Sequence, residues 1–366
     1  MMKIKTGVST LMMILACVVL ASMLGCSSSS SDGDDGLHNA RLEGNFATAS
    51  FECTLDASGN ADSYEVKGGD MTSNGNGTGD MGSDNFTYTM AADNTFDITT
   101  SGNTDKGILS PSGNFLTVVD TDETDSEISL AVAVKKPSDT VALADLNGDW
   151  LLCQVRYNSD DARVHTSWLN YSFSDGTATG SSGLDSDDGV ITPPKIDYTV
   201  NSDGKMKIDA SQLEGYTDGE KFVLVDYNPN PDDNGEKEVK IIIGIKKATG
   251  GLDNASLKGN YQVMRIDSDV ADDDSCTVHL NVNFQGNDDG SGTGNWTGTV
   301  IKCSDGDPAS GKDLSGIYHV TDTGTMTIDA DAGIMSSDGE IFVTCDASTS
   351  SSDDVVAFTV GIKKND

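Results

Sequence analysis

The sequence predicts an all-β protein built from three tandem modules of about eight antiparallel strands each. Apolar residues come in short runs with strand-like alternation, and helical periodicity is absent beyond the first 26 residues. Forty glycines, together with many Asp, Asn, Ser and Thr residues, supply turn signals between these runs. The same anchor residues then recur three times in the same order, which indicates a repeated structural unit.

The anchors define modules at residues 40–137, 142–248 and 252–366. Each module opens with a Leu-x-Gly-x-aromatic motif and closes with an apolar strand followed by two lysines. Between them lie a Thr-Gly pair, a tyrosine followed ten residues later by isoleucine, and a glycine turn seven residues before an aspartate. The repeated residues are Gly44, Gly148 and Gly259; Thr78-Gly79, Thr179-Gly180 and Thr293-Gly294; Tyr88, Tyr198 and Tyr318; Asp120, Asp226 and Asp346; and Lys135-Lys136, Lys246-Lys247 and Lys363-Lys364.

Strands can be placed within a module from its turns and its alternation. Asp203-Gly204 separates two predicted strands and supplies the positive φ that a two-residue hairpin needs. The closing strands carry large apolar residues on one face and small residues on the other. The large ones are Leu130, Val132 and Val134; Ile241, Ile243 and Ile245; and Phe358, Val360 and Ile362. We expect these large residues to fill the interior of each module.

Eight strands joined by short turns form a meander that can close into a barrel and remove both exposed edges. The alternative is a six-bladed β-propeller, in which each module would supply two four-stranded blades. A propeller requires each module to divide into similar halves, and no half-repeat is visible, so barrels are preferred. The opening strands, of which Gly148-x-Trp150 is the best match, resemble the first strand of lipocalin- and avidin-like barrels. That resemblance implies a fold class and no functional residue.

The N-terminus has the pattern of a secretory leader. Lys3 and Lys5 precede an uncharged apolar run that is too short for a comfortable membrane span. The run ends in Ser22-Met23-Leu24-Gly25-Cys26, which resembles the lipobox of bacterial lipoproteins. In that family the leader is cut before the cysteine, which then carries the lipid. The resemblance implies a signal peptide at 1–25, lipidation of Cys26 and, with Ser27 next, an outer-membrane location facing the periplasm or the cell surface.

Residues 26–39 are rich in Ser, Asp and Gly and cannot bury a core, so they are predicted to tether the modules to the membrane. The 366-residue chain has a formal net charge of -36. Such a charge repels nucleic acid and anionic lipid surfaces, and it favours solubility and attraction to cations. The membrane is therefore a predicted partner only through the lipid anchor, while the protein or small-molecule partner is not specified by the sequence.

Five cysteines remain after the leader and Cys26 are set aside, and an exported protein can form disulfides. We predict a Cys276–Cys303 disulfide within the enlarged middle of module three. It would close a loop of 27 residues and stabilise the fold by about 3 kcal/mol through loop entropy. Cys345 takes the place held by Val119 and Val225 in the other modules, so it is interpreted as a small buried hydrophobe.

No catalytic constellation is visible. Neither a G-x-S-x-G elbow nor an H-E-x-x-H motif occurs, and the histidines are interpreted as neutral or solvated surface groups. They are His38, His165, His279 and His319. Acidic clusters at 120–123, 185–188 and 272–274 could attract Ca²⁺, but none completes a calcium loop, so no metal site and no cofactor is predicted. Trp168 and Trp296 lie where the modules differ in length, and a ligand surface would be expected there.

Two functions of different classes follow. The first is a membrane-anchored, non-catalytic lipoprotein of the cell envelope, with the modules used for binding or as a spacer. The alternative is a carrier that holds a small apolar ligand in each barrel, as lipocalin-like proteins do. In either case we expect a module such as residues 40–136 to fold by itself.

Overall fold

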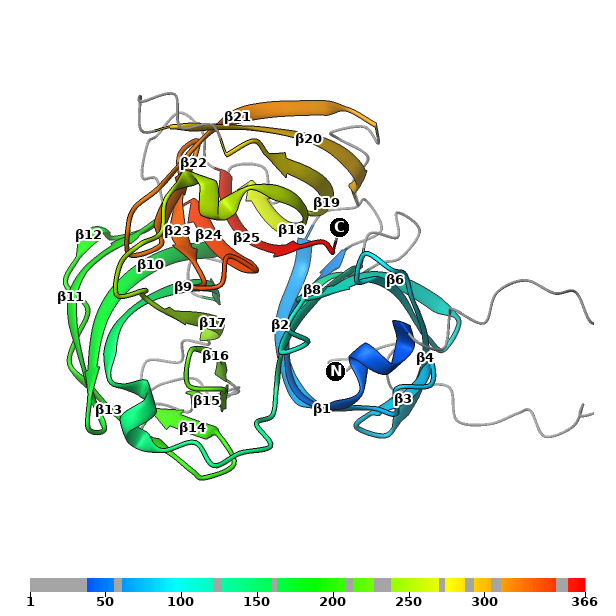
Figure 1. Ribbon diagram of the computed structural model, residues 1–366, viewed down its shortest axis with the longest axis horizontal. Helices are drawn as coiled ribbons and strands as arrows, with labels where there is room; N and C mark the ends of the chain where they lie inside the picture. Colours follow the sequence, from blue (N-terminus) through cyan, green and yellow to red (C-terminus); the bar gives the residue numbers. More distant parts are fainter. Residues whose placement is uncertain are drawn as a thin grey trace, which may run out of the picture.

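The computed structural model describes residues 38–55, 61–120, 127–159, 163–208, 213–226, 238–269, 274–286, 293–303, 311–346 and 355–365. Cys26 and the predicted signal peptide lie outside these residues. In the described segments, no helix is both long and apolar enough to cross a bilayer. The architecture is all-β, with three closed antiparallel barrels (Figure 1).

Barrel 1 is an eight-stranded meander in which each strand pairs with the next and the first pairs with the last. Its strands are β1 (Gly44–Leu55), β2 (Ala61–Ser73), β3 (Thr78–Met81), β4 (Asp84–Met90), β5 (Thr95–Thr100), β6 (Asn103–Leu109), β7 (Phe115–Asp120) and β8 (Glu127–Lys135). A 3₁₀ turn, η2 (Ala40–Leu42), precedes them and leaves Leu42 fully buried.

Barrel 2 repeats this order after η3 (Leu143–Leu146), with one additional short strand, β12, paired to the edge of β11. Its strands are β9 (Gly148–Asn158), β10 (Arg163–Ser174), β11 (Thr177–Asp185), β12 (Gly189–Ile191), β13 (Ile196–Val200), β14 (Lys205–Ile208), β15 (Leu213–Thr217), β16 (Lys221–Asp226) and β17 (Glu238–Lys246). The β10–β11 pairing closes the ring.

Barrel 3 follows η4 (Asn254–Leu257) and is again a closed eight-stranded meander. Its strands are β18 (Gly259–Asp269), β19 (Asp274–Phe284), β20 (Gly294–Cys303), β21 (Asp313–Val320), β22 (Thr325–Ile328), β23 (Asp331–Met335), β24 (Ile341–Asp346) and β25 (Val355–Lys363). Three closed rings confirm the predicted barrels, and the propeller alternative is wrong.

The opening motif forms the floor of each barrel. In barrel 1 the leucine and the aromatic residue, Leu42 and Phe46, are both fully buried, and Gly44 between them has φ of 139°. A Cβ atom at Gly44 would lie 2.6 Å from Lys135, the first residue of the closing lysine pair, whose ammonium lies 5.7 Å from the Phe46 ring centroid. The repeated glycine and the repeated lysine therefore belong to one packing unit. Gly204 has φ of 83°, as its predicted hairpin turn requires.

The closing strands face the opposite way from the prediction. The nine large residues named above point out of the barrels, and the residues that alternate with them, small apart from Ile242, point into the lumens. Gly244 lies beneath the Phe222 ring, and a Cβ there would be 2.1 Å from a ring carbon. Gly361 lies beneath Phe342 in the same manner. The expectation that the large residues fill the barrel interiors is wrong, because they lie in the core between the barrels while other side chains, such as Phe222 in barrel 2 and Phe342 in barrel 3, occupy the lumens.

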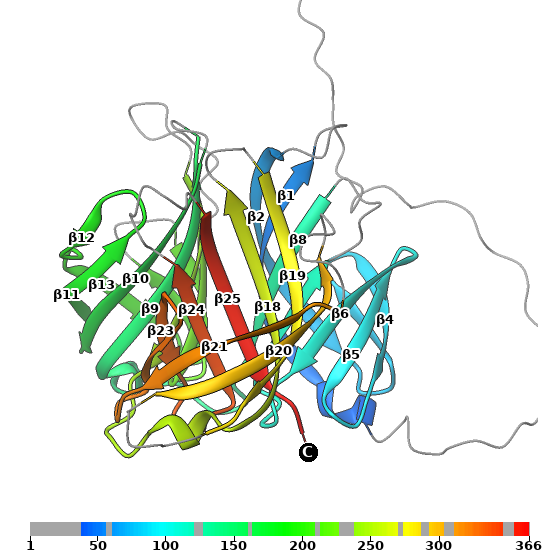
Figure 2. The same cartoon turned by 90° about the horizontal axis from the view of Figure 1, so that it is seen from above.

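The outward-facing residues of all three barrels meet in one central core. This inter-barrel core contains 29 buried residues, including all nine large residues of the closing strands. The lumens hold three separate apolar clusters. Figure 1 shows the barrels arranged around this centre, and Figure 2 shows β1, β2, β18, β19 and β25 running alongside one another through the middle of the molecule.

The three barrel junctions are equivalent. At each one, the first two strands of a barrel pack against the last two of another: barrel 1 on β16 and β17, barrel 2 on β24 and β25, and barrel 3 on β7 and β8. Thr166 of β10 donates a hydrogen bond to the Asp346 carbonyl, and Thr277 of β19 donates one to the Asp120 carbonyl. The repeated aspartates end their strands, as predicted. The carbonyls of Asp120 and Asp346 accept hydrogen bonds across two of these junctions. The internal repeat has therefore produced a pseudo-threefold assembly within one chain.

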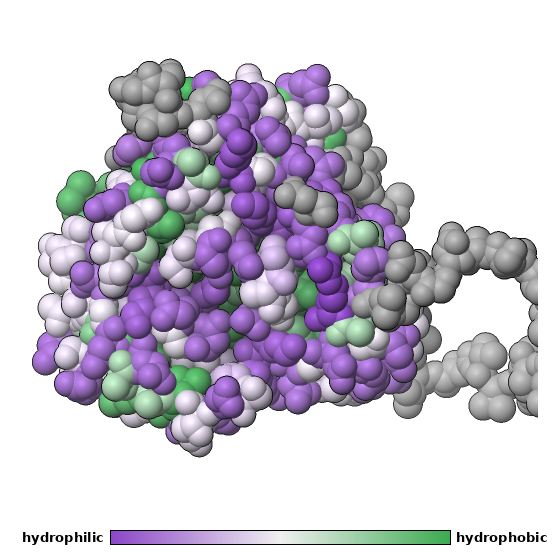
Figure 3. Space-filling view, viewed as in Figure 1, coloured by the Kyte–Doolittle hydropathy of each residue, from purple (hydrophilic) through white to green (hydrophobic). Residues whose placement is uncertain are grey.

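The visible surface agrees with this arrangement. The face in Figure 3 is mostly hydrophilic, with small scattered apolar patches. Of the large hydrophobic side chains in the described segments, Val190 and Ile317 are exposed. The apolar outer faces of the barrels are covered by one another.

Candidate functional site

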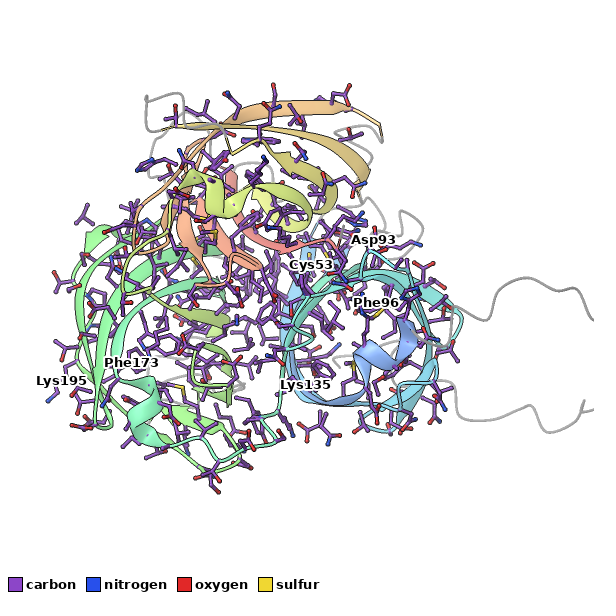
Figure 4. All side chains as sticks on the ribbon, viewed as in Figure 1. Cys53, Asp93, Phe96, Lys135, Phe173 and Lys195 are labelled. Atoms are coloured by element: carbon purple, nitrogen blue, oxygen red, sulfur yellow. The ribbon has the colours of Figure 1, made fainter. Side chains whose placement is uncertain are left out.

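The lower half of each lumen, which is the half nearest the opening 3₁₀ turn, is filled by the protein's own side chains. Phe96 lies inside barrel 1 (Figure 4), in a cluster with Phe46, Phe86 and Tyr88. The Tyr88 hydroxyl donates to the Asn39 carbonyl at 2.9 Å, which ties β4 to the turn below the barrel. Barrel 3 repeats this contact between its own tyrosine and asparagine, also at 2.9 Å. These contacts close the floor of the lumen in barrels 1 and 3.

The upper half of the barrel 1 lumen is charged. Lys67 of β2 forms an ion pair with Glu52 of β1, and Ser50 donates to Glu52 at 2.7 Å. Burial, with the Glu52 carboxylate nearby, raises the pKa of Glu127 to about 7. Burial disfavours the charged form of a carboxyl, and a second carboxylate adds to this effect.

Barrels 2 and 3 carry their own cation–carboxylate clusters in the lumen. Arg156, six residues after the first-strand aromatic as Glu52 is in barrel 1, lies 3.1 Å from Asp185 and 3.5 Å from Glu238. In barrel 3, Arg265 lies 2.8 Å from Asp331. Burial raises the pKa of Asp331 to about 6, with nearby carboxylates adding to the effect and Arg265 opposing it. An apolar ligand would displace water from these ion pairs and offer them no hydrogen bond in return, so lumens lined in this way are unfavourable for such a ligand.

The predicted site residues are only partly described. Cys26 lies outside the described residues, as do parts of the acidic clusters at 120–123 and 272–274. The side chain of Cys303 is also outside them, so the Cys276–Cys303 disulfide stays a prediction; the backbone pairs Cys303 with Val278, two residues from Cys276. Within the described segments, no group of three or more His, Cys, Asp or Glu side chains could hold a metal ion.

The interpretation of the histidines as surface groups is wrong for two of them. His165 and His279 are 5% and 2% exposed. His279 lies between barrels 1 and 3, on the outer face of β19, with its ring against the Gln262 amide. Burial, reinforced by the Lys364 and Lys106 ammonium groups, lowers the pKa of His279 to about 4. The sequence alternation could not reveal the burial of His279, because it does not show that the outer face of a barrel is covered.

The two variable-region tryptophans do not form an exposed ligand surface. Trp168 packs against the inter-barrel core and Trp296 against the barrel 3 lumen cluster. The Trp296 indole N–H donates to Asp329 at 3.2 Å. Both rings serve packing, so the expectation of a ligand surface built on them is not supported.

A groove of about 690 Å³ lies where barrel 3 meets barrel 1. It runs over the outer faces of β18, β19, β20 and β21, beside the C-terminal residues and the turn that follows β4. Its polar lining consists of amides, hydroxyls and three charged groups: Asn260, Asn281, Asn283, Thr297, Thr299, Ser315 and Asn365, with Asp93, Asp313 and Lys364. The groove could not be predicted from the sequence because strands of barrel 3 form most of it and Asp93 of barrel 1 completes it.

The polar groups of the groove are held in place by one another. Lys364 lies 2.9 Å from Asp93 and donates to Asn281 at 3.2 Å. Partial burial opposes ionisation of Asp93, but the Lys364 ammonium and Thr95 outweigh it and lower the pKa of Asp93. Thr299 donates to Asp313 at 2.9 Å. The single lysine charge is thus already paired, and the groove offers mainly neutral donors and acceptors.

The Lys364–Asn281 contact has an equivalent in each barrel. The second closing lysine bonds the corresponding residue of the second strand: Lys247 donates to Asn170 at 2.6 Å, and Lys136 pairs with Asp70 at 2.6 Å. Asn170 does not line the groove. It is therefore a matched control for Asn281, with the same residue type, register and lysine partner.

Acidification is expected to destabilise the protein through His279. The unfolded histidine has a pKa near 6.5 and the folded one a pKa of about 4, so the unfolded state binds more protons between these values. Stability should fall by about 2–3 kcal/mol as the pH drops from 7 to 4.5. His279→Gln removes this contribution, which urea denaturation at the two pH values would measure.

The raised pKa values of Glu127 and Asp331 act in the opposite direction, favouring the folded state at low pH. Glu127 and Asp331 are present in the wild type and in His279→Gln, so their contributions cancel when the two proteins are compared. His319→Gln, at an exposed position of β21, is the control and should keep the wild-type pH dependence. An unchanged pH dependence in His279→Gln would contradict the prediction.

No protein-family profile matches the sequence, and no curated protein matches it. Several solved structures are similar in outline. One is a mutant of transferrin binding protein B from Haemophilus parasuis, 11% identical, with 87% of this chain and 75% of that chain covered and a TM-score of 0.29. Another is a protein of unknown function from Nostoc punctiforme, 7% identical, covering 61% of this chain and 97% of that chain at a TM-score of 0.22.

Transferrin binding protein B from Neisseria meningitidis is 8% identical, with 88% of this chain and 77% of that chain covered at a TM-score of 0.21. Scores this low do not transfer the arrangement or the activity of these proteins to this chain.

Proposed function

We propose that the chain is a lipid-anchored, non-catalytic protein of the cell envelope that binds an uncharged, hydroxyl-rich ligand, an oligosaccharide, in the groove between barrels 1 and 3. The groove is the observation that carries this proposal. Its lining combines amides and hydroxyls, which both donate and accept hydrogen bonds, with carboxylates that accept them. Sugar hydroxyls require the same mixture of donors and acceptors.

Two further observations favour this ligand class. A peptide that binds as an added strand needs a free sheet edge, and the described strands of barrels 1 and 3, which form the groove, close into rings without one. An anionic ligand would meet a chain with a net charge of -36 and a groove whose lysine is already paired with Asp93.

The carrier alternative is weaker for a separate reason. Its lumens would have to admit an apolar molecule, yet their lower halves hold the protein's own aromatic rings and their upper halves hold ion pairs. An external groove is therefore preferred to an internal cavity.

The ligand proposal is tested on an array of neutral oligosaccharides probed with residues 27–366, followed by calorimetric titration of the sugars that bind. The double variant Asn281→Ala/Thr299→Val is expected to bind at least about tenfold more weakly, because two hydrogen bonds are lost. Asn170→Ala, the matched control, should bind like the wild type. A blank array, or equal affinity of the groove variant, would contradict the proposal, and selective capture of peptides would favour the rival ligand class.

The anchor is tested separately in a bacterial host. Cys26→Ala should leave the leader uncut by the lipoprotein peptidase and abolish acylation, as metabolic labelling with a fatty acid would detect. Acylation that persists in this variant would rule out Cys26 as the lipid site.

A further inference from the structure

Two cysteines from different barrels meet inside the inter-barrel core. Cys153 lies on β9 and Cys345 on β24, and both side chains are fully buried. The Cys345 thiol donates to the Ser167 carbonyl at 3.2 Å, and the Cys153 thiol donates to the Val343 carbonyl at 3.6 Å. Each thiol thus reaches the backbone on the other side of the barrel 2–barrel 3 junction.

The two thiols also contact each other. The Cys345 thiol lies within hydrogen-bonding reach of Cys153, and burial, together with this neighbour, raises the pKa of Cys345 well above its usual range. Both are free thiols in this structure, and they share one apolar site at the junction.

The pseudo-threefold repeat supplies an independent observation. The position three residues after the first-strand aromatic is Ala49 in barrel 1, Cys153 in barrel 2 and Met264 in barrel 3. The residue before the strand-ending aspartate is Val119, Val225 or Cys345. At the barrel 1–barrel 2 junction the corresponding residues, Ala49 and Val225, line the same small cavity.

Equivalent positions therefore meet at the barrel 1–barrel 2 and barrel 2–barrel 3 junctions. Both are cysteines only between barrels 2 and 3, while the other two junctions combine an apolar residue with valine. A small hydrophobe would serve packing at either position alone. The coincidence of two cysteines at one junction points to a bond between them.

We propose that Cys153 and Cys345 form a disulfide that joins barrels 2 and 3 in the exported protein. The reaction is thiol–disulfide exchange with an oxidised dithiol protein. One cysteine thiolate attacks the oxidant's disulfide and gives a mixed disulfide, and the second thiolate then displaces the oxidant. The oxidant leaves as a dithiol, its two sulfurs having accepted the two electrons that the cysteine pair loses. The proposal rests on export through the predicted leader and is independent of the groove ligand.

Burial fixes when this exchange takes place. Neither sulfur is accessible once the barrels have docked, so oxidation occurs during folding, before the junction closes. The same burial protects the finished bond from reductants. The predicted burial of Cys345 is confirmed, and the structure adds Cys153 beside it, a partner that the sequence did not indicate.

The test uses the full chain with its leader, expressed in a bacterium and recovered from the envelope. Free thiols are alkylated in denaturant without reductant, and the tryptic peptides are analysed by mass spectrometry. The expected result is a Cys153–Cys345 linked pair in most molecules, lost after reduction in denaturant. Recovery of both cysteines as alkylated peptides, or linkage of Cys345 to Cys276 or Cys303, would overturn the proposal.

Two variants keep the test independent of folding defects. Cys153→Val/Cys345→Val replaces both thiols with apolar side chains and should fold with an unchanged circular dichroism spectrum, since the equivalent positions of the other barrels are also apolar: Val119 and Val225 for Cys345, Ala49 and Met264 for Cys153. In Cys345→Ala, Cys153 should become fully alkylated. Cys53→Ala is the control and should leave the linked pair intact.

Discussion

Ile243→Asp is expected to destabilise all three barrels together, by more than about 4 kcal/mol, because it places a charge in a dry apolar site without a partner. Ile243 is fully buried, and its side chain belongs to the inter-barrel core rather than to the lumen of barrel 2. In a separate barrel the same side chain would face solvent, and aspartate would be tolerated. The substitution therefore distinguishes a fused assembly from three independent domains.

Val190→Asp is the matched control, since it introduces the same charge at a β-branched residue of the same barrel. Val190 is 86% exposed, so its replacement should change stability by no more than about 0.5 kcal/mol. Urea denaturation followed by tryptophan fluorescence and by circular dichroism measures both variants. Similar small effects at the two positions would show that the outer face of barrel 2 is not covered in solution.

Barrel 1 alone, residues 40–137, is expected not to form a soluble monomer. Its outer face carries Phe51, Phe115, Leu130 and Val132, all at most 2% exposed in the whole protein. Removing barrels 2 and 3 exposes them as one contiguous apolar patch, which promotes association or unfolding. This reverses the expectation drawn from the repeat alone, that a module folds by itself.

Analytical ultracentrifugation and circular dichroism of this fragment test the prediction, with the protein 27–366 as the reference. A monomeric fragment with a β-type spectrum and a cooperative melt would contradict it. A soluble, monomeric fragment obtained only after several outward residues are made polar would support it.

The repeat and the turns could be predicted from sequence because they depend on local rules. A glycine at a hairpin position must supply a positive φ, and Gly204 does so. Closed eight-stranded barrels also follow, since the repeated anchors set the length and strand count of each module. These features need no knowledge of what lies beyond the module.

The orientation of the strands could not be predicted in the same way. Alternation separates Val132 from Ala133 but does not say which side is the lumen. In a lone barrel the larger residue would be inside; here it is outside because another barrel covers it. The ionisable residues six positions after the opening aromatics, such as Glu52 and Arg156, were the available signal: they share a face with the small residues, so that face is the charged half of the lumen.

The groove and the burial of His279 could not be predicted from the sequence for a related reason. Asp93 and Asn281 are far apart in sequence and meet only when barrel 3 docks on barrel 1. The Cys153 and Cys345 contact likewise depends on docking of barrels 2 and 3. Sites formed between modules carry no local pattern, because each half lies on a different repeat.

Differential scanning calorimetry of residues 27–366 at pH 7 tests most directly whether the three barrels form one cooperative body. A shared apolar core predicts a single transition in which the calorimetric and van't Hoff enthalpies agree. Separate transitions, or a van't Hoff enthalpy near one third of the calorimetric value, would show three barrels that unfold independently and would contradict the inter-barrel core.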